Sequence, residues 1–213
     1  MSTNAKQRFD ETIIRCDTLL DVAHNSSEMS LKDDILRYTI VLAVSALDMY
    51  AGDRFGENFV SVLKSHSPNK ADIQFLEKIH VGMIDVLELL RETPKHPYRR
   101  FRTLVDEYLS HNSMQSLMKI DDLYAYYGLP KITKQACEKA KRKNLYKVIG
   151  KLLRRRNQIV HGCDYNGLNV VQGISETEVR RWIKSLKLLI ENIEVILIKR
   201  FPQRQVNNST QKS

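Results

Sequence analysis

The segment from Arg156 to His161, Arg-Asn-Gln-Ile-Val-His, combines a guanidinium, an amide and an imidazole that could converge on a phosphate group. Arg156 stands where helical spacing places the next residue of an apolar stripe. The preceding members of that stripe are Leu145, Val148, Ile149, Leu152 and Leu153. Because a buried unpaired charge is costly, Arg156 must have a buried partner, reach a cleft or lie at an interface. Arg156, Asn157 and His161 are therefore our candidate site residues.

Helix geometry limits how these side chains can meet. Arg156 and His161 are about 140° apart in azimuth and about 7.5 Å apart in rise on a regular helix, so they do not share a face. Asn157 and His161, four residues apart, do share one. Convergence on one phosphate would be easier if a second copy of the helix faced the first. The alternative is that Arg156 forms an ion pair with a neighbouring helix and that His161 interacts only with the helix dipole.

The same Arg-to-His spacing occurs a second time, from Arg91 to His96. That copy contains Pro94, which interrupts helices, and we expect it on a loop between two of them. We therefore discard it as a site.

The positive charge of the chain is concentrated around the first copy. Between Lys131 and His161 there are eleven Lys or Arg residues and one acidic residue, Glu138, which gives a net charge of +10 and leaves the rest of the chain nearly neutral. A solvated helix face usually mixes signs, whereas one-signed clustering favours a polyanionic partner such as nucleic acid. An acidic membrane surface or an acidic protein is the alternative. The expected phosphate contacts are Lys141, Arg142, Lys143, Lys147, Lys151, Arg154 and Arg155.

Helices must position these residues, because the chain has few glycines and prolines and long amphipathic periods. The periodicity predicts helices at about 5–23, 30–63, 72–90, 99–109 and 114–127. A basic helical stretch from 133 should then lead into 144–161, and a last helix should cover 175–199. We expect one all-α domain over residues 1–201 and a disordered tail at 202–213.

The remaining chemistry of the chain is sparse. The three cysteines are far apart and form no Cys-x-x-Cys pair, so we expect reduced thiols in the cytoplasm rather than disulfides or zinc. The other histidines show no metal-ligand spacing, and we expect neither a metal nor a cofactor. A secretion signal and an apolar run of about 20 residues are both missing, which argues against membrane insertion.

A polar strip interrupts the most apolar of the predicted helices. Arg37, Ser45 and Asp48 fall within about 80° of one another on that helix. Asp48 could therefore lie close to the candidate site as a neighbour of Arg156 and His161. The alternative is an internal network in which Arg37 pairs with Asp48 between helices.

The Arg156–Gly162 segment resembles the Arg-polar-x3-His signature of HEPN ribonucleases. The segment Arg37–Tyr50 is similar to the early long helix of the RiboL-PSP branch of that superfamily. The stretch Met114–Leu129, followed by Leu152–Asn157, also fits that branch. The resemblance is strongest over residues 30–161.

This resemblance implies an up-and-down helical bundle with additional helices that forms a homodimer and cleaves RNA without a metal. Arg156 would stabilise the phosphorane charge, Asn157 would orient the phosphate or the histidine, and His161 would move the proton of the ribose 2′-hydroxyl or of the leaving oxygen. The relatives imply a toxin or antiviral-defence effector, with an antitoxin or defence-system protein as a further partner. In some toxin members a tyrosine modified by a nucleotidyltransferase stands two residues after the histidine, where this chain has Cys163. The rival hypothesis is a non-catalytic helical module that binds RNA or a protein.

Overall fold

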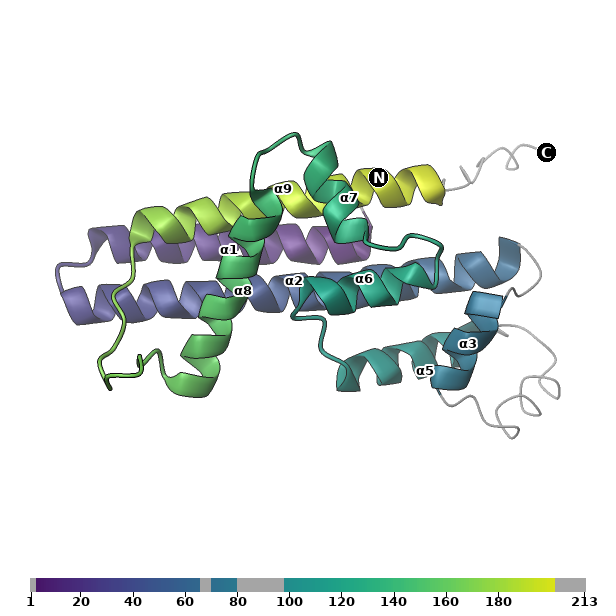
Figure 1. The fold of residues 1–213 in the computed structure, drawn as a ribbon, viewed down its shortest axis with the longest axis horizontal. Coiled ribbons are helices and arrows are strands. Elements are labelled where there is room, and N and C mark those ends of the chain that lie inside the picture. Colours follow the sequence, from purple (N-terminus) through teal and green to yellow (C-terminus); the bar gives the residue numbers. More distant parts are fainter. Residues whose placement is uncertain (1–2, 66–69, 80–97, 202–213) are drawn as a thin grey trace, which may run out of the picture.

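The computed structural model describes residues 3–65, 70–79 and 98–201, and these residues are almost entirely helical (Figure 1). Within them there is no β-strand, only an isolated antiparallel bridge between Tyr165 and Val171. The all-α prediction is confirmed. The helices are α1 (Asn4–Asn25), α2 (Met29–Ser65), α3 (Lys70–Lys78), α5 (Tyr98–His111), α6 (Leu117–Ala125), α7 (Ile132–Lys139), α8 (Leu145–Gly162) and α9 (Glu176–Arg200).

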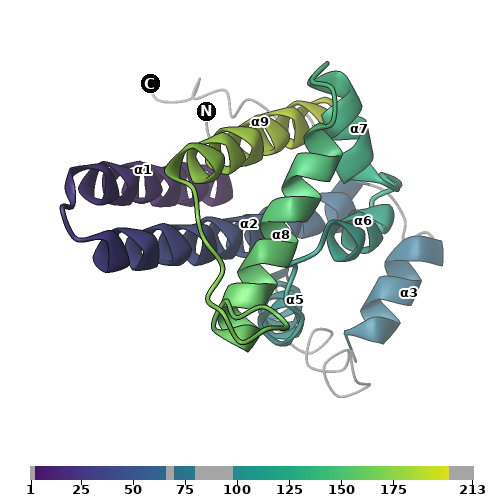
Figure 2. The same ribbon diagram turned by 60° about the vertical axis from the view of Figure 1, so that its left-hand side comes forward.

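Three long helices form the body of the bundle. α1 runs antiparallel to α2 and α9, and the three lie side by side (Figure 1). α8 crosses this layer steeply and contacts both α2 and α9 (Figure 2). α7 packs on α9 at the beginning of α8, whereas the loop at 163–173 leaves the other end of α8. α8 thus lies across the bundle. We call the side of α8 that faces away from α2 and α9 its outer side.

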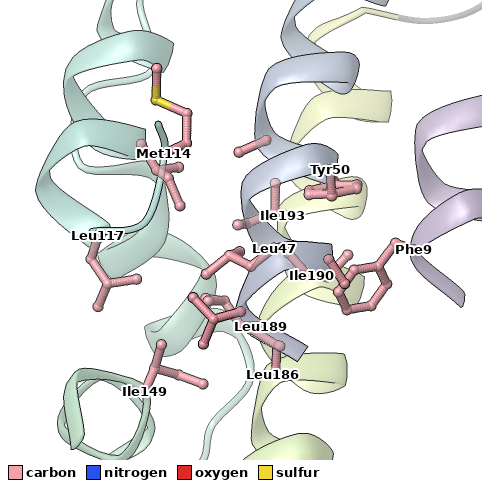
Figure 3. Packing of buried hydrophobic residues seen from close by; sticks show 14 of the residues in the cluster. Phe9, Leu47, Tyr50, Met114, Leu117, Ile149, Leu186, Leu189, Ile190 and Ile193 are labelled. Atoms are coloured by element: carbon pink, nitrogen blue, oxygen red, sulfur yellow. The ribbon is translucent and has the colours of Figure 1, made fainter. Parts of the chain in front are cut away.

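One hydrophobic core joins these helices because each contributes an apolar stripe at a spacing of three or four residues. Figure 3 shows Phe9 of α1, Leu47 and Tyr50 of α2, and Ile190 of α9 meeting in this core, with Ile149 of α8 on the other side of Leu47. Contrary to the expectation from the sequence, one apolar stretch, Met29–Phe59 of α2, is long and apolar enough to cross a membrane, but more than half of its most apolar part is buried inside the bundle. Its composition is that of a core helix, which the contacts with α1, α8 and α9 explain.

A buried polar network ties α2 to α9 inside the core. The carboxylate of Glu194 accepts hydrogen bonds from the hydroxyl of Tyr50 at 2.8 Å and from Nε of Arg54 at 2.9 Å. Nη1 of Arg54 also donates to Asn58 Oδ1 at 2.8 Å. Because unpaired buried polar groups are costly, these bonds favour one register of α2 against α9.

The predicted helix boundaries differ from the observed ones in two places. The stretch expected to be helical from 114 begins at Leu117 instead, because Asp48 binds the residues just before it. The basic stretch from 133 to 161 is broken at 140–144, where Lys141 and Asn144 adopt left-handed backbone conformations with φ of 50° and 67°. Most of the predicted helix at 72–90, the Arg91–His96 copy and the tail at 202–213 lie outside the described residues.

Candidate active site

Arg156 lies on the inner side of α8, as the apolar stripe predicted, beyond the last fully buried residues of that stripe. The side chain is half-buried. Its Nε atom is buried and has no hydrogen-bond partner among the described residues, and Nη1 donates to Asn157 Oδ1 at 3.3 Å. The alternative in which Arg156 forms an ion pair with a neighbouring helix is not seen in the described part of the chain. A guanidinium of this kind retains donors for an added anion.

His161 lies at the end of α8 and is exposed. The turn that follows is unusual, because Cys163 and Asp164 both have left-handed backbone conformations, with φ of 47° and 63°. Such conformations cost about 1–2 kcal/mol for most residues other than glycine. Persistent strain of this kind needs surrounding contacts to hold it in place.

A buried ion cluster holds that turn in place. Oδ2 of Asp164 accepts hydrogen bonds from Nε of Arg37 and Nη2 of Arg155, both at 2.8 Å, and the side chain of Asp164 is fully buried. The same two arginines donate to the backbone carbonyls of Gln172 and Gly173, at the far end of the loop. We call Arg37, Arg155 and Asp164 the loop clamp. Burial alone would lower the pKa of Arg37, but hydrogen bonds to Asp164 and Asp34 outweigh it and leave the pKa raised.

The loop clamp corrects two predictions. Arg155 was expected to contact RNA, but its guanidinium is committed to Asp164, Gln172 and Gly173. Arg37 was considered as the partner of Asp48, but it binds Asp164 instead. Sequence reasoning missed Asp164 altogether.

Asp48 was considered as a neighbour of the candidate site or as the partner of Arg37, but the structure shows other contacts. Its carboxylate accepts hydrogen bonds from the backbone N–H of Met114, the hydroxyl of Ser113 and the amide of Gln115. It therefore fixes the segment that leads into α6. None of the contacts found for Asp48 in the described part of the chain reaches Arg156 or His161.

The other predicted phosphate contacts fall into two groups. Lys147, Lys151 and Arg154 are exposed on the outer side of α8. Lys147, Arg154 and His161 are spaced by seven residues, so they lie nearly in line along that side. Lys141, Arg142 and Lys143 are exposed on the loop between α7 and α8, at the opposite end of the helix from His161.

One chain supplies the groups for phosphate binding and proton transfer but does not direct them to the same point. A guanidinium with unused donors can bind a phosphate, and an exposed imidazole can accept and donate a proton. One copy of α8 nevertheless directs Arg156 inward and His161 outward, since the two differ by about 140°. Among the described residues, no group of three or more His, Cys, Asp or Glu side chains is arranged to hold a metal ion.

The family model that matches this chain is RiboL-PSP-HEPN, over residues 10–199. The chain belongs to this family. The match extends well beyond the segments that carried the resemblance, and it covers most of α1, the loop clamp and nearly all of α9. HEPN domains are generally associated with ribonucleases, and an all-α fold is consistent with the match. Comparisons with curated proteins and with solved structures gave no match.

Proposed function

We propose that this RiboL-PSP-HEPN protein is a cytoplasmic endoribonuclease that cleaves RNA without a metal. The observation that carries the proposal is the half-buried Arg156, whose Nε has no partner among the described residues, on the helix that ends with the exposed His161. The exposed cations along the same helix supply the phosphate contacts that an RNA strand needs.

The proposed reaction is a transesterification within the RNA. The ribose 2′-oxygen attacks the adjacent phosphorus, its proton passes to a base, and the bond to the 5′-oxygen of the next nucleotide breaks as that oxygen takes a proton. His161 serves in these proton transfers, and Arg156 stabilises the charge that builds up on the phosphorane oxygens. Asn157, bonded to Arg156, orients the guanidinium or the phosphate. The products are a 2′,3′-cyclic phosphate and a 5′-hydroxyl.

We further propose that the active form is a homodimer in which Arg156 of one chain meets His161 of the other. A second copy would bring together two side chains that one helix directs apart. An exposed apolar patch lies directly after His161 and would favour such contact: Tyr165, Leu168, Val170 and Val171 are all exposed, Leu168 to 83%. A toxin or antiviral-defence role, held in check by an antitoxin or another defence-system protein, follows from the HEPN relatives and belongs to the same proposal.

Incubation of the purified protein with total RNA in EDTA, followed by mapping of the ends, tests the chemistry. We expect cleavage to survive EDTA and to leave cyclic or 3′-phosphate ends with 5′-hydroxyl partners, because this reaction needs no metal-bound water. DNA, which has no 2′-hydroxyl, should be spared. Cleavage that requires Mg²⁺ or leaves 5′-phosphates would contradict the mechanism.

Substitution of the site residues tests the assignment within the same assay. Arg156→Ala and His161→Ala should each lower cleavage by at least about 100-fold, as expected for the loss of a charge stabiliser or a proton-transfer group. Arg91→Ala and His96→Ala, which alter the second copy of the same spacing, are the matched controls and should have little effect. If the wild type binds RNA but neither it nor any variant cleaves, or if both site variants cleave as the wild type does, the non-catalytic binding module is the better description.

A further inference from the structure

An open hollow of about 890 Å³ lies between α6, α7 and the beginning of α8. Its volume falls in the range of about 300–1,000 Å³ that is usual for small-ligand sites. Its surface is mainly apolar, with Met118, Leu145 and Tyr146 among the side chains that line it. Met118 and Tyr146 remain 68% and 44% exposed, so the hollow offers an apolar floor and an accessible aromatic ring.

The charged side chains that line this hollow are mostly cations. The triplet Lys141–Lys143 on the α7–α8 loop supplies three of them, and Lys131 and Lys134 at the beginning of α7 supply two more. The carboxylates of the lining are Asp121 and Asp122 of α6 and Glu138 of α7. Asp121 is already used, because it accepts hydrogen bonds from the backbone N–H and the hydroxyl of Thr133 near the beginning of α7. An anionic group is therefore favoured at the loop, where all three charged side chains are cations.

The loop that carries the triplet leads directly into α8. Lys141 and Asn144 hold left-handed backbone conformations, and α8 begins directly after them. Tyr146 lies one residue into α8, in a setting where desolvation, followed by the carboxylate of Asp121, raises the pKa of its hydroxyl. The aromatic ring and the cationic loop are thus held next to each other by the same helix start.

A nucleotide combines the two properties that this arrangement would recognise. Its base is a flat apolar surface that stacks on aromatic rings, and its phosphate is an anion that lysine and arginine neutralise. The hollow lies at one end of α8 and His161 at the other, 16 residues away, which is about 24 Å at the rise of an α-helix. Lys147 and Arg154 lie between them on the exposed side.

We propose that this hollow holds an unpaired nucleotide of the RNA strand that the enzyme cleaves, with the base on Tyr146 and its phosphates on the Lys141–Lys143 loop. This inference rests on the proposed function and adds a second contact point for the same substrate. The strand runs along the outer side of α8 from the hollow to His161. At about 3.4 Å per stacked nucleotide, the 24 Å separation corresponds to at most about seven nucleotides, and fewer where the strand is extended.

Binding measurements in a His161→Ala background test the hollow without depending on cleavage. A fluorescent, unstructured 12-nucleotide RNA is titrated by anisotropy against the background protein and against the same protein with Tyr146→Ala or Tyr146→Phe. We expect Tyr146→Ala to weaken binding about 10-fold, the size of one lost base-stacking contact, and Tyr146→Phe to retain it. Tyr38→Ala removes a ring that is 55% exposed on α2 and is the matched control, which should not change the affinity.

The length of the RNA separates a nucleotide site from a general loss of affinity. RNAs that extend only two nucleotides on either side of the scissile bond cannot reach the hollow, so Tyr146→Ala should leave their binding unchanged. Replacing Lys141, Arg142 and Lys143 together by Gln should flatten the slope of log affinity against log salt by up to about 2 for the long RNA only, since each lost phosphate contact on a single strand removes about 0.7. Thermal melting of every variant verifies that the fold is retained.

Failure of the hollow and failure of the proposed function give different results. If the wild type cleaves RNA in EDTA but Tyr146→Ala and the triple variant bind the long RNA like their background, the hollow takes no part and the inference is overturned. If no cleavage is found but the Tyr146-dependent, length-dependent binding is present, the hollow stands and the ribonuclease does not. Tyr146-dependent binding of an acidic peptide together with unchanged RNA affinity would make the hollow a protein-docking site, which also overturns the inference.

Discussion

The buried carboxylate in the turn after His161 belongs to Asp164, which the sequence did not single out. Asp164 is fully buried, adopts a left-handed conformation three residues after His161, and binds both Arg37 and Arg155. Its backbone N–H donates to the carbonyl of Gln158 in the last turn of α8. The end of the helix, and the imidazole on it, are therefore positioned by a carboxylate that does not need to touch the substrate.

Asp164→Asn should slow cleavage without weakening RNA binding. Asparagine keeps the left-handed backbone accessible but leaves two neighbouring guanidinium groups without their anion, which is costly in a buried site. We expect kcat to fall about 10-fold or more, as a displaced catalytic group predicts, with KM unchanged and a lower Tm. Steady-state kinetics on a defined RNA, with a thermal melt, give all three values.

Asp34→Asn is the matched control for this substitution. Asp34 also binds Arg37, at 3.0 Å, but its side chain is 76% exposed, so solvent compensates for its loss. Kinetics and Tm close to the wild-type values are expected. Equal effects of the two substitutions would mean that Arg37, and not the buried carboxylate, holds the turn.

The sequence predicted the side of α8 on which Arg156 lies, because that position depends on one helix alone. The position of Arg156 on the inner side of α8 follows from helical arithmetic within that helix, and the structure places it there. The loop clamp joins Arg37 to Asp164 across 127 positions of the chain, and no local period reports such a pair. The one available signal was Arg37 in an apolar helix. Asp48, the carboxylate on the same face of that helix, was the wrong partner, because Arg37 binds Asp164.

At the scale of elements, one carboxylate joins the beginning of α9 to the turn between α1 and α2. Glu176 forms ion pairs with Arg180 at 2.9 Å, Lys32 at 3.1 Å and His24 at 3.2 Å. Hydrogen bonds from Arg180 and then from Lys32 lower the pKa of Glu176 to about 2. α9 is held in register with the other two long helices at this end of the bundle.

The ion pairs of Glu176 predict how the stability of the fold changes with pH. Because the pKa of Glu176 is lower in the folded chain than its ordinary value of 4.5, its contribution to stability is complete above about pH 4.5 and is lost as the pH falls toward about 2. Glu176→Gln should therefore lower the Tm by a few degrees at pH 7, and the difference from wild type should vanish near pH 2. Glu178→Gln, in the same first turn and without an ion pair among the described residues, should show a smaller effect at pH 7. A Glu176→Gln difference that grows on acidification would contradict this linkage.

Helix boundaries were predictable where they follow from the apolar pattern within one helix. They were not predictable where a residue far away in the sequence binds the segment. α1, α2 and α9 appear close to the expected ranges because their apolar stripes are long and regular. α6 begins three residues late because Asp48 of α2 captures the preceding segment. The break between α7 and α8 lies in a lysine-rich run without glycine or proline, so no local signal marked the left-handed residues Lys141 and Asn144.

At the scale of the whole molecule, the open question is how Arg156 and His161 could meet, and the proposed answer is a two-fold symmetric dimer. Figure 2 shows α8 lying across α2 and α9. On this helix Arg156 and His161 are about 140° apart in azimuth, so they point away from each other within one chain. A two-fold arrangement of two α8 helices would place the Arg156 of each copy near the His161 of the other. In the proposed homodimer, the exposed apolar residues at 165–171, which follow His161 in the chain, are available for such a contact.

Mixing two inactive variants tests this arrangement directly. Arg156→Ala and His161→Ala are co-expressed with different tags, and the mixed dimer is isolated by two successive affinity steps. If the site is shared between chains, the mixed dimer retains one Arg156 and one His161 that face each other across the interface, and its cleavage rate should rise well above both parents, which are each about 100-fold impaired. Mixed dimers of either variant with an Arg156→Ala/His161→Ala double variant have lost one of the two groups entirely and should stay inactive. A mixed dimer that is isolated intact but cleaves no faster than its parents would contradict a site shared between the two chains.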